Sequence, residues 1–160
     1  MSEVEVRTCA ARDAQDLVRL IGGFRDHLGA ASPTDAQLQA QVPRALADPA
    51  IEFAIAWQGE VPVGFCQLRF ATSVWVAGNE AHLEDLFTVP AARRQSVGRR
   101  LVRHAVARAR ERGALRLTLN TNEGNREAQA LYRAEGLAPT THARYPGGQE
   151  VLWSMRVGED

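Results

Sequence analysis

The sequence predicts a mixed α/β fold in three layers, and two observations lead to that class. Strand-like and helix-like segments alternate along the chain as a strand, two helices, three strands, a helix, a strand, a helix and two strands. Residues 81–121 make a strand–helix–strand unit, which is normally parallel and right-handed, among strands that follow one another through short turns. We therefore expect a mostly antiparallel sheet of about seven strands, with one central parallel β-α-β unit and about four flanking helices.

The first half of the chain is expected to supply a strand, two helices and a hairpin. Alternating or continuous apolar residues predict the strands, and apolar residues three or four positions apart predict the helices. Gly29 ends the first helix, Ser32-Pro33-Thr34-Asp35 opens the second, and Gly59 lies in a tight turn. The expected elements are a strand at 4–10, helices at 11–28 and from 32–35 to about 48, and strands at 51–57 and 61–70.

The second half is expected to contain the parallel unit and a C-terminal pair of strands. Pro90 closes the strand that opens the unit, and Gly113 and Gly136 stop the two helices. The expected elements are a less regular connection at 72–80, a strand at 81–89, a helix at 97–112, a strand at 115–121, a helix at 126–135, and strands around 138–145 and 149–157.

The composition is typical of a soluble globular protein. The 160 residues are 45% hydrophobic and 24% charged, which fits a single domain over 1–160 and argues against disorder or a disulfide-stapled scaffold. No apolar run approaches the length of a membrane span, and the N-terminal residues lack an apolar stretch of signal-peptide length. Cys9 and Cys66 lack metal-site spacing, so we expect free thiols and a cytoplasmic location.

The net charge of zero hides an uneven distribution along the chain. All 19 basic residues are arginine, and residues 93–116 hold nine of them with one acidic residue. Residues 1–92 instead carry twelve acidic residues and six arginines. A basic block of this kind either covers a solvated helix face or meets an anion.

The basic block begins where a buried strand passes through a short loop into a helix. Backbone N–H groups in the first turn of a helix lack partners within the helix and, with the helix dipole, favour a phosphate. Gly98 allows a close approach of ligand to backbone, and Arg93, Arg94 and Arg99 flank the same place. An ordinary strand-to-helix turn with solvated arginines is the alternative.

The residue spacing at this junction resembles that of a known family. Thr88-x-Pro90-x-x-Arg93-x-x-Ser96-x-Gly98 is similar to motif A of the GNAT superfamily of acyl-CoA-dependent N-acetyltransferases, whose usual form is V-x-P-x-x-R-x-x-G-x-G/A. The spacing is kept, and Ser96 replaces the first glycine of the usual pattern. That replacement matters if the position needs a positive φ, which serine tolerates poorly.

A second segment resembles motif B of the same superfamily. The pattern N-x-x-A-x-x-L-Y followed by a small turn and glycine is matched by Asn125, Ala128, Leu131, Tyr132 and Gly136. Both motifs occur in the usual order, and the expected order of elements matches the GNAT fold over nearly the whole chain.

The resemblance implies an N-acetyltransferase that passes an acetyl group from acetyl-CoA to a primary amine by direct attack in a ternary complex. It implies that a backbone N–H of Thr88 or Val89 meets the thioester carbonyl and that Tyr132 protonates the leaving thiolate. The acetyl-CoA-binding residues carried over from the motifs are Phe87, Thr88, Val89, Arg93, Arg94, Gln95, Ser96, Val97, Gly98, Arg99, Asn125, Ala128 and Tyr132.

The remaining site residues are assigned with alternatives open. Glu84 aligns with a strand glutamate that several GNAT members use as general base, and a buried glutamate paired with an arginine, or one that only anchors substrate, is the alternative. Asp85, on the opposite side of the strand, is a candidate contact for a cationic acceptor. His27 and Trp75 are candidates for lining the acceptor site. His82 and Glu84 are too few ligands for a metal site, so no metal is predicted.

The acceptor is expected to be a small amine, such as a polyamine, an amino acid or an aminoglycoside. The enzymatic alternative is acetylation of a peptide or protein at its N-terminus or at lysine. Two non-enzymatic interpretations remain, a non-catalytic acyl-CoA-binding module and a nucleic-acid binder, and few aromatic residues accompany the arginines to favour the second. We expect no nucleic-acid or membrane partner, and both a monomer and a homodimer formed through the C-terminal strands are left open.

Overall fold

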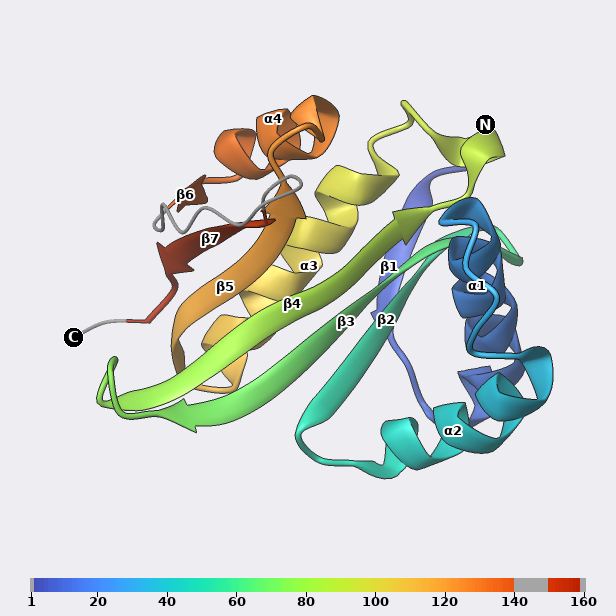
Figure 1. Ribbon diagram of the computed structural model, residues 1–160, viewed down its shortest axis with the longest axis horizontal. Helices are drawn as coiled ribbons and strands as arrows, with labels where there is room; N and C mark the ends of the chain where they lie inside the picture. The colour runs from blue at the N-terminus through green and yellow to red at the C-terminus, as the bar shows by residue number, and fades with distance from the viewer. Residues whose placement is uncertain (1, 140–149, 159–160) are drawn as a thin grey trace. The chain divides into compact units, whose positions relative to one another are not determined.

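The computed structural model describes residues 2–139 and 150–158. Its strands form one seven-stranded sheet in the order β1-β2-β3-β4-β5-β7-β6 (Figure 1). β4 and β5 are parallel, whereas the pairs β1–β2, β5–β7 and β6–β7 are antiparallel. The elements in chain order are β1 (Val4–Thr8), η1 (Ala11–Asp13), α1 (Ala14–His27), α2 (Asp35–Ala47), β2 (Ile51–Gln58), β3 (Val61–Ser73), β4 (Gly78–Thr88), η2 (Pro90–Ala92), α3 (Val97–Glu111), β5 (Ala114–Asn122), α4 (Arg126–Ala134), β6 (Ala138–Pro139) and β7 (Glu150–Arg156). The predicted fold class and element order are confirmed.

The expected irregular connection at 72–80 is wrong in its extent. β3 continues to Ser73 and β4 already starts at Gly78, so a short hairpin replaces the connection. The tip is exposed, with Val74 at 84% and Trp75 at 91% of full exposure. Backbone pairing extends these strands into solvent. Their ends bury no side chains there, so the sequence lacks the apolar periodicity that would predict strands.

The two C-terminal strands are described in part. β6 comprises Ala138–Pro139, and the rest of the strand expected at 138–145 lies outside the described residues. β7 spans Glu150–Arg156, within the strand expected at 149–157, and pairs with β5 and β6. No helix in the described part of the chain is long and apolar enough to cross a membrane.

The chain folds as two compact units, which are described in turn. Unit 1 comprises residues up to 67 together with 85–101, and unit 2 comprises 68–84 together with the residues from 102 onward. The single domain over 1–160 stays a prediction.

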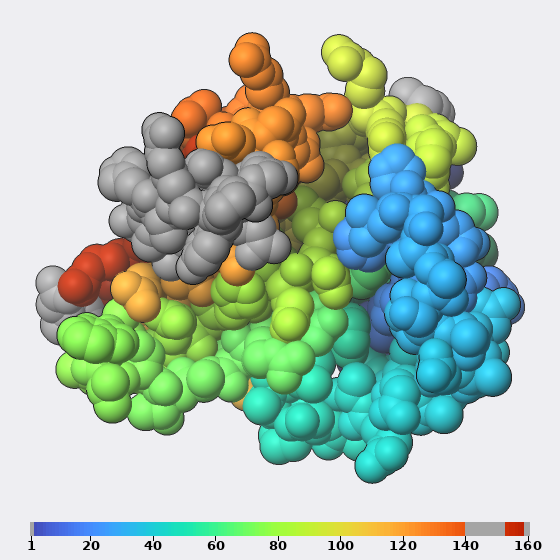
Figure 2. Space-filling model, in the orientation of Figure 1, coloured from blue at the N-terminus to red at the C-terminus, as the bar shows by residue number. Residues whose placement is uncertain are grey.

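Unit 1 has an apolar core between α1, α2 and the strands. The helices gather on one surface of the unit, blue to cyan in Figure 2. Leu17 and Leu20 of α1 are buried against Ile55 of β2 and Phe65 of β3, and Phe87 of β4 joins the same cluster. Each fully buried side chain of this size contributes roughly 1.5–3 kcal/mol of hydrophobic stabilisation.

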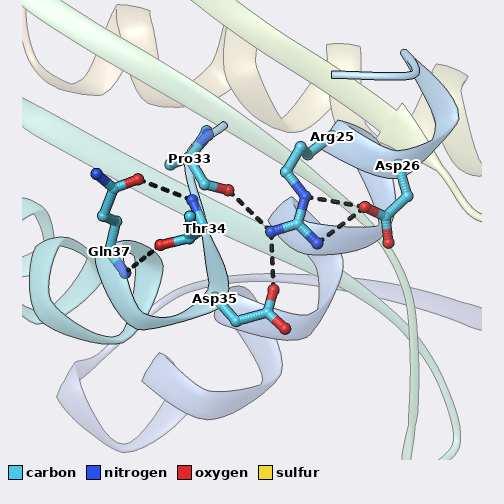
Figure 3. A network of polar contacts seen from close by, with 6 residues as sticks. All are labelled: Arg25, Asp26, Pro33, Thr34, Asp35 and Gln37. Carbon is cyan, nitrogen blue, oxygen red and sulfur yellow. Dashed lines mark hydrogen bonds and ion pairs between the residues drawn. The ribbon is translucent and has the colours of Figure 1, made fainter. Parts of the chain in front are cut away.

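A polar network fixes the connection between α1 and α2 (Figure 3). The Arg25 guanidinium donates to the Pro33 carbonyl at 2.8 Å and to Asp35 at 2.7 Å, so it ties the end of α1 to the start of α2. Thr34 caps α2 by accepting from the Gln37 amide at 3.2 Å, and the Gln37 side chain accepts from the Thr34 amide at 2.8 Å. This reciprocal capping box places the start of α2 where Ser32–Asp35 predicted it.

Unit 2 is organised around the parallel pair β4–β5. Leu83 pairs with Leu119, and both side chains are buried. Trp153 of β7 pairs with Leu119 from the other side and is 1% exposed. The Tyr132 ring of α4 lies 6.1 Å from the Trp153 ring, so α4 packs on the strands through this aromatic pair.

Candidate active site

In unit 1, the chain leaves β4 at Thr88 and enters α3 at Val97 through η2 and a four-residue loop. Arg94 and Ser96 have φ values of 61° and 63°, in the left-handed region that non-glycine residues rarely adopt. The position that carries glycine in the family motif therefore does need a positive φ here, and serine occupies it. Left-handed residues in a turn orient successive N–H groups toward one point, which is a known way to bind anions.

The first turn of α3 adds further amides to this loop. The Arg100 amide donates to the Ser96 carbonyl at 3.0 Å, which is the first bond along the helix. The amides of Val97 and Gly98 precede it in the first turn, where α3 offers them no carbonyl four residues earlier. The side chain of Val97 is 1% exposed and anchors the turn in the core.

Two side chains of the loop, those of Arg93 and Gln95, form hydrogen bonds with other residues of unit 1. Arg93 Nε donates to the Thr88 carbonyl at 3.4 Å, and Arg93 Nη2 lies 3.2 Å from His27 Nε2. Because a guanidinium can only donate, His27 Nε2 accepts this bond and the ring proton lies on Nδ1. Gln95 accepts from Gln58 Nε2 at 2.6 Å, so its side chain braces the loop.

The two amides expected near the thioester carbonyl differ in their surroundings. The Val89 amide donates to the Val63 carbonyl at 2.9 Å. Successive N–H groups of a strand point to opposite edges, so the Thr88 amide points away from β3. The Thr88 amide is therefore the one of the two that is not directed at the Val63 carbonyl.

A pocket of about 410 Å³ lies between α1 and the end of β4, within unit 1. Phe87 and Val89, the two neighbours of Thr88, form part of its wall. His27 is exposed and its ring lies 6.0 Å from the Phe87 ring. The described residues that line it are Arg19, Leu20, Gly23, His27, Pro62, Phe87, Val89 and Pro90.

In unit 2, polar side chains occupy one face of β4. Glu84 accepts from Arg69 Nε at 2.8 Å, and both side chains are partly exposed. This is the arginine pairing that the sequence left open for Glu84, but the expected burial of that glutamate is wrong, because Glu84 is exposed. Asp85, the first residue of the returning segment of unit 1, is half-buried and has polar contacts of its own.

His82 lies two residues before Glu84, on the same side of β4. Its Nδ1 is 2.7 Å from Thr118 Oγ1, and that hydroxyl donates to the Ala81 carbonyl at 3.5 Å. Since a hydroxyl has one proton, Nδ1–H donates to Thr118 and the lone pair lies on Nε2. Burial lowers the pKa of His82, although the carboxylates of Glu84 and Glu80 oppose that shift, so the ring is neutral at pH 7.

The motif B residues lie at the start and middle of α4. Asn125 Oδ1 accepts from the Ala128 amide at 3.2 Å, which caps the helix and gives this pair a local structural role. Tyr132 is 7% exposed, and burial raises its pKa to about 12. Its hydroxyl therefore keeps its proton at neutral pH and can donate it.

The structure groups the predicted residues by unit. Unit 1 contains the motif A residues together with His27, and unit 2 contains Glu84 together with motif B. Trp75 projects from the β3–β4 hairpin tip, with 91% of its surface exposed.

Sequence reasoning missed several residues of both units. Arg19 and Gly23 line the pocket with His27, and their spacing of four along α1 was a usable signal. Pro62 reaches the same pocket and Arg69 reaches Glu84 from β3, for which the sequence carries no local signal.

Comparison with known proteins confirms the family that the two motifs resemble. The family model for the Acetyltransferase (GNAT) family matches residues 19–137. A thialysine N-epsilon-acetyltransferase of Caenorhabditis elegans is 37% identical over 83 residues, which cover 52% of this chain and 51% of that protein. The uncharacterized N-acetyltransferase YhfO of Bacillus subtilis is 31% identical over 139 residues, covering 86% of this chain and 92% of that protein. The chain spans about half the length of the first curated relatives it matches.

Solved structures agree with the fold. A structure reported as a probable acetyltransferase superimposes with a TM-score of 0.80 at 25% identity, over 88% of this chain and 95% of that one. The aminoglycoside N-acetyltransferase AAC(6')-Iy in complex with CoA gives a TM-score of 0.75 at 19% identity, over 91% and 94% of the two chains.

Proposed function

Because the chain belongs to the acetyltransferase (GNAT) family, we propose that it transfers an acetyl group from acetyl-CoA to the primary amine of a small-molecule acceptor. The observation that carries this proposal is the loop before α3. Arg94 and Ser96 both adopt positive φ there, and the first turn of α3 adds the backbone amides of Val97 and Gly98. Such a backbone suits the pyrophosphate of CoA. The name of the thialysine-acetylating relative supports a small amine as acceptor.

Acylation of an amine requires three contributions from groups of the protein. One group removes a proton from the ammonium so that the neutral amine can attack, one polarises the thioester carbonyl, and one protonates the leaving thiolate. The N–C bond forms as the C–S bond breaks, so the amine loses one proton and the sulfur gains one. Acetyl-CoA, when bound, supplies the activated acetyl group for this exchange.

Thr88 polarises the carbonyl through its backbone N–H, because that amide points away from the β3 carbonyl that engages Val89. Tyr132 acts as the acid. Burial raises its pKa to about 12, which keeps the phenol protonated until a basic thiolate needs the proton. Replacing Tyr132 with phenylalanine should lower kcat while leaving acetyl-CoA binding largely intact. Unchanged turnover would show that the acid is another group.

Glu84 acts as the general base, directly or through water. Its carboxylate accepts a hydrogen bond from Arg69 Nε at 2.8 Å, which holds the carboxylate in place on its face of β4. His82 is the competing base, because its Nε2 carries the lone pair on the same side of β4. Comparing Glu84→Gln with His82→Gln separates the two: the variant that loses the base should lose the rising limb of the kcat/KM against pH profile.

The first experiment for this proposal is a thermal-shift titration with acetyl-CoA, with adenosine diphosphate as the control ligand. Ligand at about 100 times its Kd stabilises the protein by about 2.7 kcal/mol. A saturable shift with acetyl-CoA that adenosine diphosphate does not reproduce supports the cofactor. Absence of a shift at millimolar acetyl-CoA contradicts it.

The alternative functions can be distinguished by binding and thiol-release assays on the same protein. A non-catalytic acyl-CoA-binding module would show the thermal shift but release no thiol with any amine. A peptide or protein acetyltransferase would release thiol with peptides that carry a free N-terminus or lysine, and not with small amines. A nucleic-acid binder would instead show binding that weakens steeply with added salt.

We further propose that the protein acts in the cytoplasm as a homodimer, with neither a membrane nor a nucleic acid as partner. The C-terminal strands would pair across the two-fold axis. Sedimentation equilibrium gives the test: a mass of twice 17.5 kDa supports the dimer, and 17.5 kDa contradicts it.

A further inference from the structure

We propose that the pocket between α1 and the end of β4 binds the carbon chain of the acceptor, and that Arg19 binds an anionic group at the far end of that chain. The anion is a carboxylate or a phosphonate. This inference rests on the proposed function and names its class of substrate: an extended primary amine with an apolar middle and an anionic tail.

The chemistry of the pocket lining excludes a polycation as the best acceptor. Five of its residues offer apolar side chains, and Gly23 leaves room beside them. Its polar members are Arg19 and His27, and none of the described residues that line it is acidic. A polyamine would bring further ammonium groups next to a guanidinium, with no carboxylate among these described lining residues to pair with. The apolar residues are Leu20, Pro62, Phe87, Val89 and Pro90.

The two polar members stand at opposite ends of one helix face. Arg19, Gly23 and His27 are spaced by four residues, so they lie on the same side of α1. Eight residues of α-helix span about 12 Å. A ligand that lies along this face can therefore place its two ends near different groups.

The His27 end is the reacting end. Arg93 joins His27 to the Thr88 carbonyl through contacts of 3.2 Å and 3.4 Å. The proposed function places the reacting amine beside the Thr88 amide. The amine must then lie at this end, and the tail of the acceptor extends over Gly23 toward Arg19.

Arg19 is equipped to receive an anion there. Its Nη1 contacts Asp16 Oδ1 at 3.1 Å, which uses one of the five guanidinium N–H groups. The side chain is 73% exposed, so its other N–H groups can be reached from solvent. The planar guanidinium matches carboxylate and phosphonate oxygens in a bidentate arrangement, which a single ammonium cannot do.

The test compares four acceptors with the same six-carbon chain, scored by thiol release from acetyl-CoA. They are 6-aminohexanoate, 6-aminohexylphosphonate, hexylamine and 1,6-diaminohexane. We expect kcat/KM to be about tenfold or more higher for an anionic acceptor than for hexylamine, and lowest for the diamine. The order of the two anionic acceptors distinguishes a carboxylate tail from a phosphonate tail.

The matched variants are Arg19→Gln and Arg12→Gln. The first removes the cation from the pocket and should bring the ratio of kcat/KM for 6-aminohexanoate to hexylamine close to one. The second removes an exposed charge of η1 that does not line the pocket, and should keep the ratio. A KM for acetyl-CoA that is unchanged in Arg19→Gln places the effect on the acceptor.

The outcomes distinguish failure of the anionic-tail inference from failure of the proposed function. Thiol release with all four acceptors at similar kcat/KM, or best with the diamine, overturns the anionic-tail inference and leaves the acetyltransferase intact. An anion preference that persists in Arg19→Gln also overturns it, because another group then binds the tail. Absence of thiol release with these acceptors and with a wider amine panel contradicts the proposed function itself.

Discussion

Replacing Gly64 with alanine tests how closely β3 packs against the strand end that carries Thr88. A Cβ at Gly64 would lie 2.7 Å from the Phe87 carbonyl oxygen, 3.1 Å from Val97 Cγ1 and 3.2 Å from Leu101 Cδ1. The shortest contact is to backbone, which cannot rotate away as a side chain can. The added methyl group must therefore separate β3 from β4 or from α3.

The expected loss of stability follows from these distances. Overpacking by one methyl group costs about 1–3 kcal/mol, and a backbone clash belongs in the upper part of that range. Replacing glycine also lowers the conformational entropy of the unfolded chain, which offsets about 0.4–1 kcal/mol of this loss of stability. The net loss is about 2 kcal/mol, which lowers Tm by about 4–8 °C for a domain of this size.

The matched control is Gly22→Ala in α1. The Cβ there would meet atoms no nearer than 3.8 Å, which is ordinary contact. Alanine is favoured over glycine within a helix by about 1 kcal/mol, so this variant should raise Tm by about 2–4 °C. Thermal unfolding followed by far-UV circular dichroism measures both variants. A Gly64→Ala protein with unchanged or raised Tm would refute the close approach of β3 to Phe87.

Three further predictions concern single sites. Ser96→Gly should raise the free energy of unfolding in urea by about 0.5–1 kcal/mol, because a left-handed non-glycine residue costs roughly 1–2 kcal/mol and the greater entropy of glycine in the unfolded chain offsets part of this gain. Ser96→Ala keeps the strained conformation, so equal effects of the two variants would show that backbone strain is not the cause. Thr34→Ala should remove the capping box of α2 and lower stability by about 1 kcal/mol, and a neutral result would mean that the cap adds nothing. Burial lowers the pKa of His82 below the 6.5 of an unfolded histidine, so its contribution to stability is complete above pH 6.5 and is lost as pH falls through the folded pKa. His82→Gln should therefore flatten the acid-side loss of the urea midpoint, and a slope equal to that of the parent would contradict the shift.

The fold could be read from the sequence because its elements carry local signals. Apolar residues at helical spacing marked α1 and α3, and Gly29 and Gly59 were assigned to a helix end and a turn, where both have positive φ. The β3–β4 hairpin carried no such signal. The ends of its strands are held in solvent by backbone pairing, and the exposed Trp75 adds no apolar periodicity that would predict a strand.

The candidate site was predictable at its backbone and less so at its side chains. The spacing of motif A located the loop before α3, and the replacement at Ser96 raised the question of φ that the structure answers. The direction of the Arg93 side chain was not predictable, because it depends on His27, 66 residues away in sequence. The same long-range dependence hid the contribution of Arg19 to the pocket.

The most direct test of the account is whether the chain makes an N-acetylated amine. Purified protein, acetyl-CoA and 6-aminohexanoate would be incubated, with thiol release followed by a colorimetric reagent and the product identified by mass spectrometry. We expect one acetylated amine for each thiol released, at a rate that Tyr132→Phe lowers. Thiol release without an acetylated amine, or no reaction with any amine of a broad panel, would contradict it.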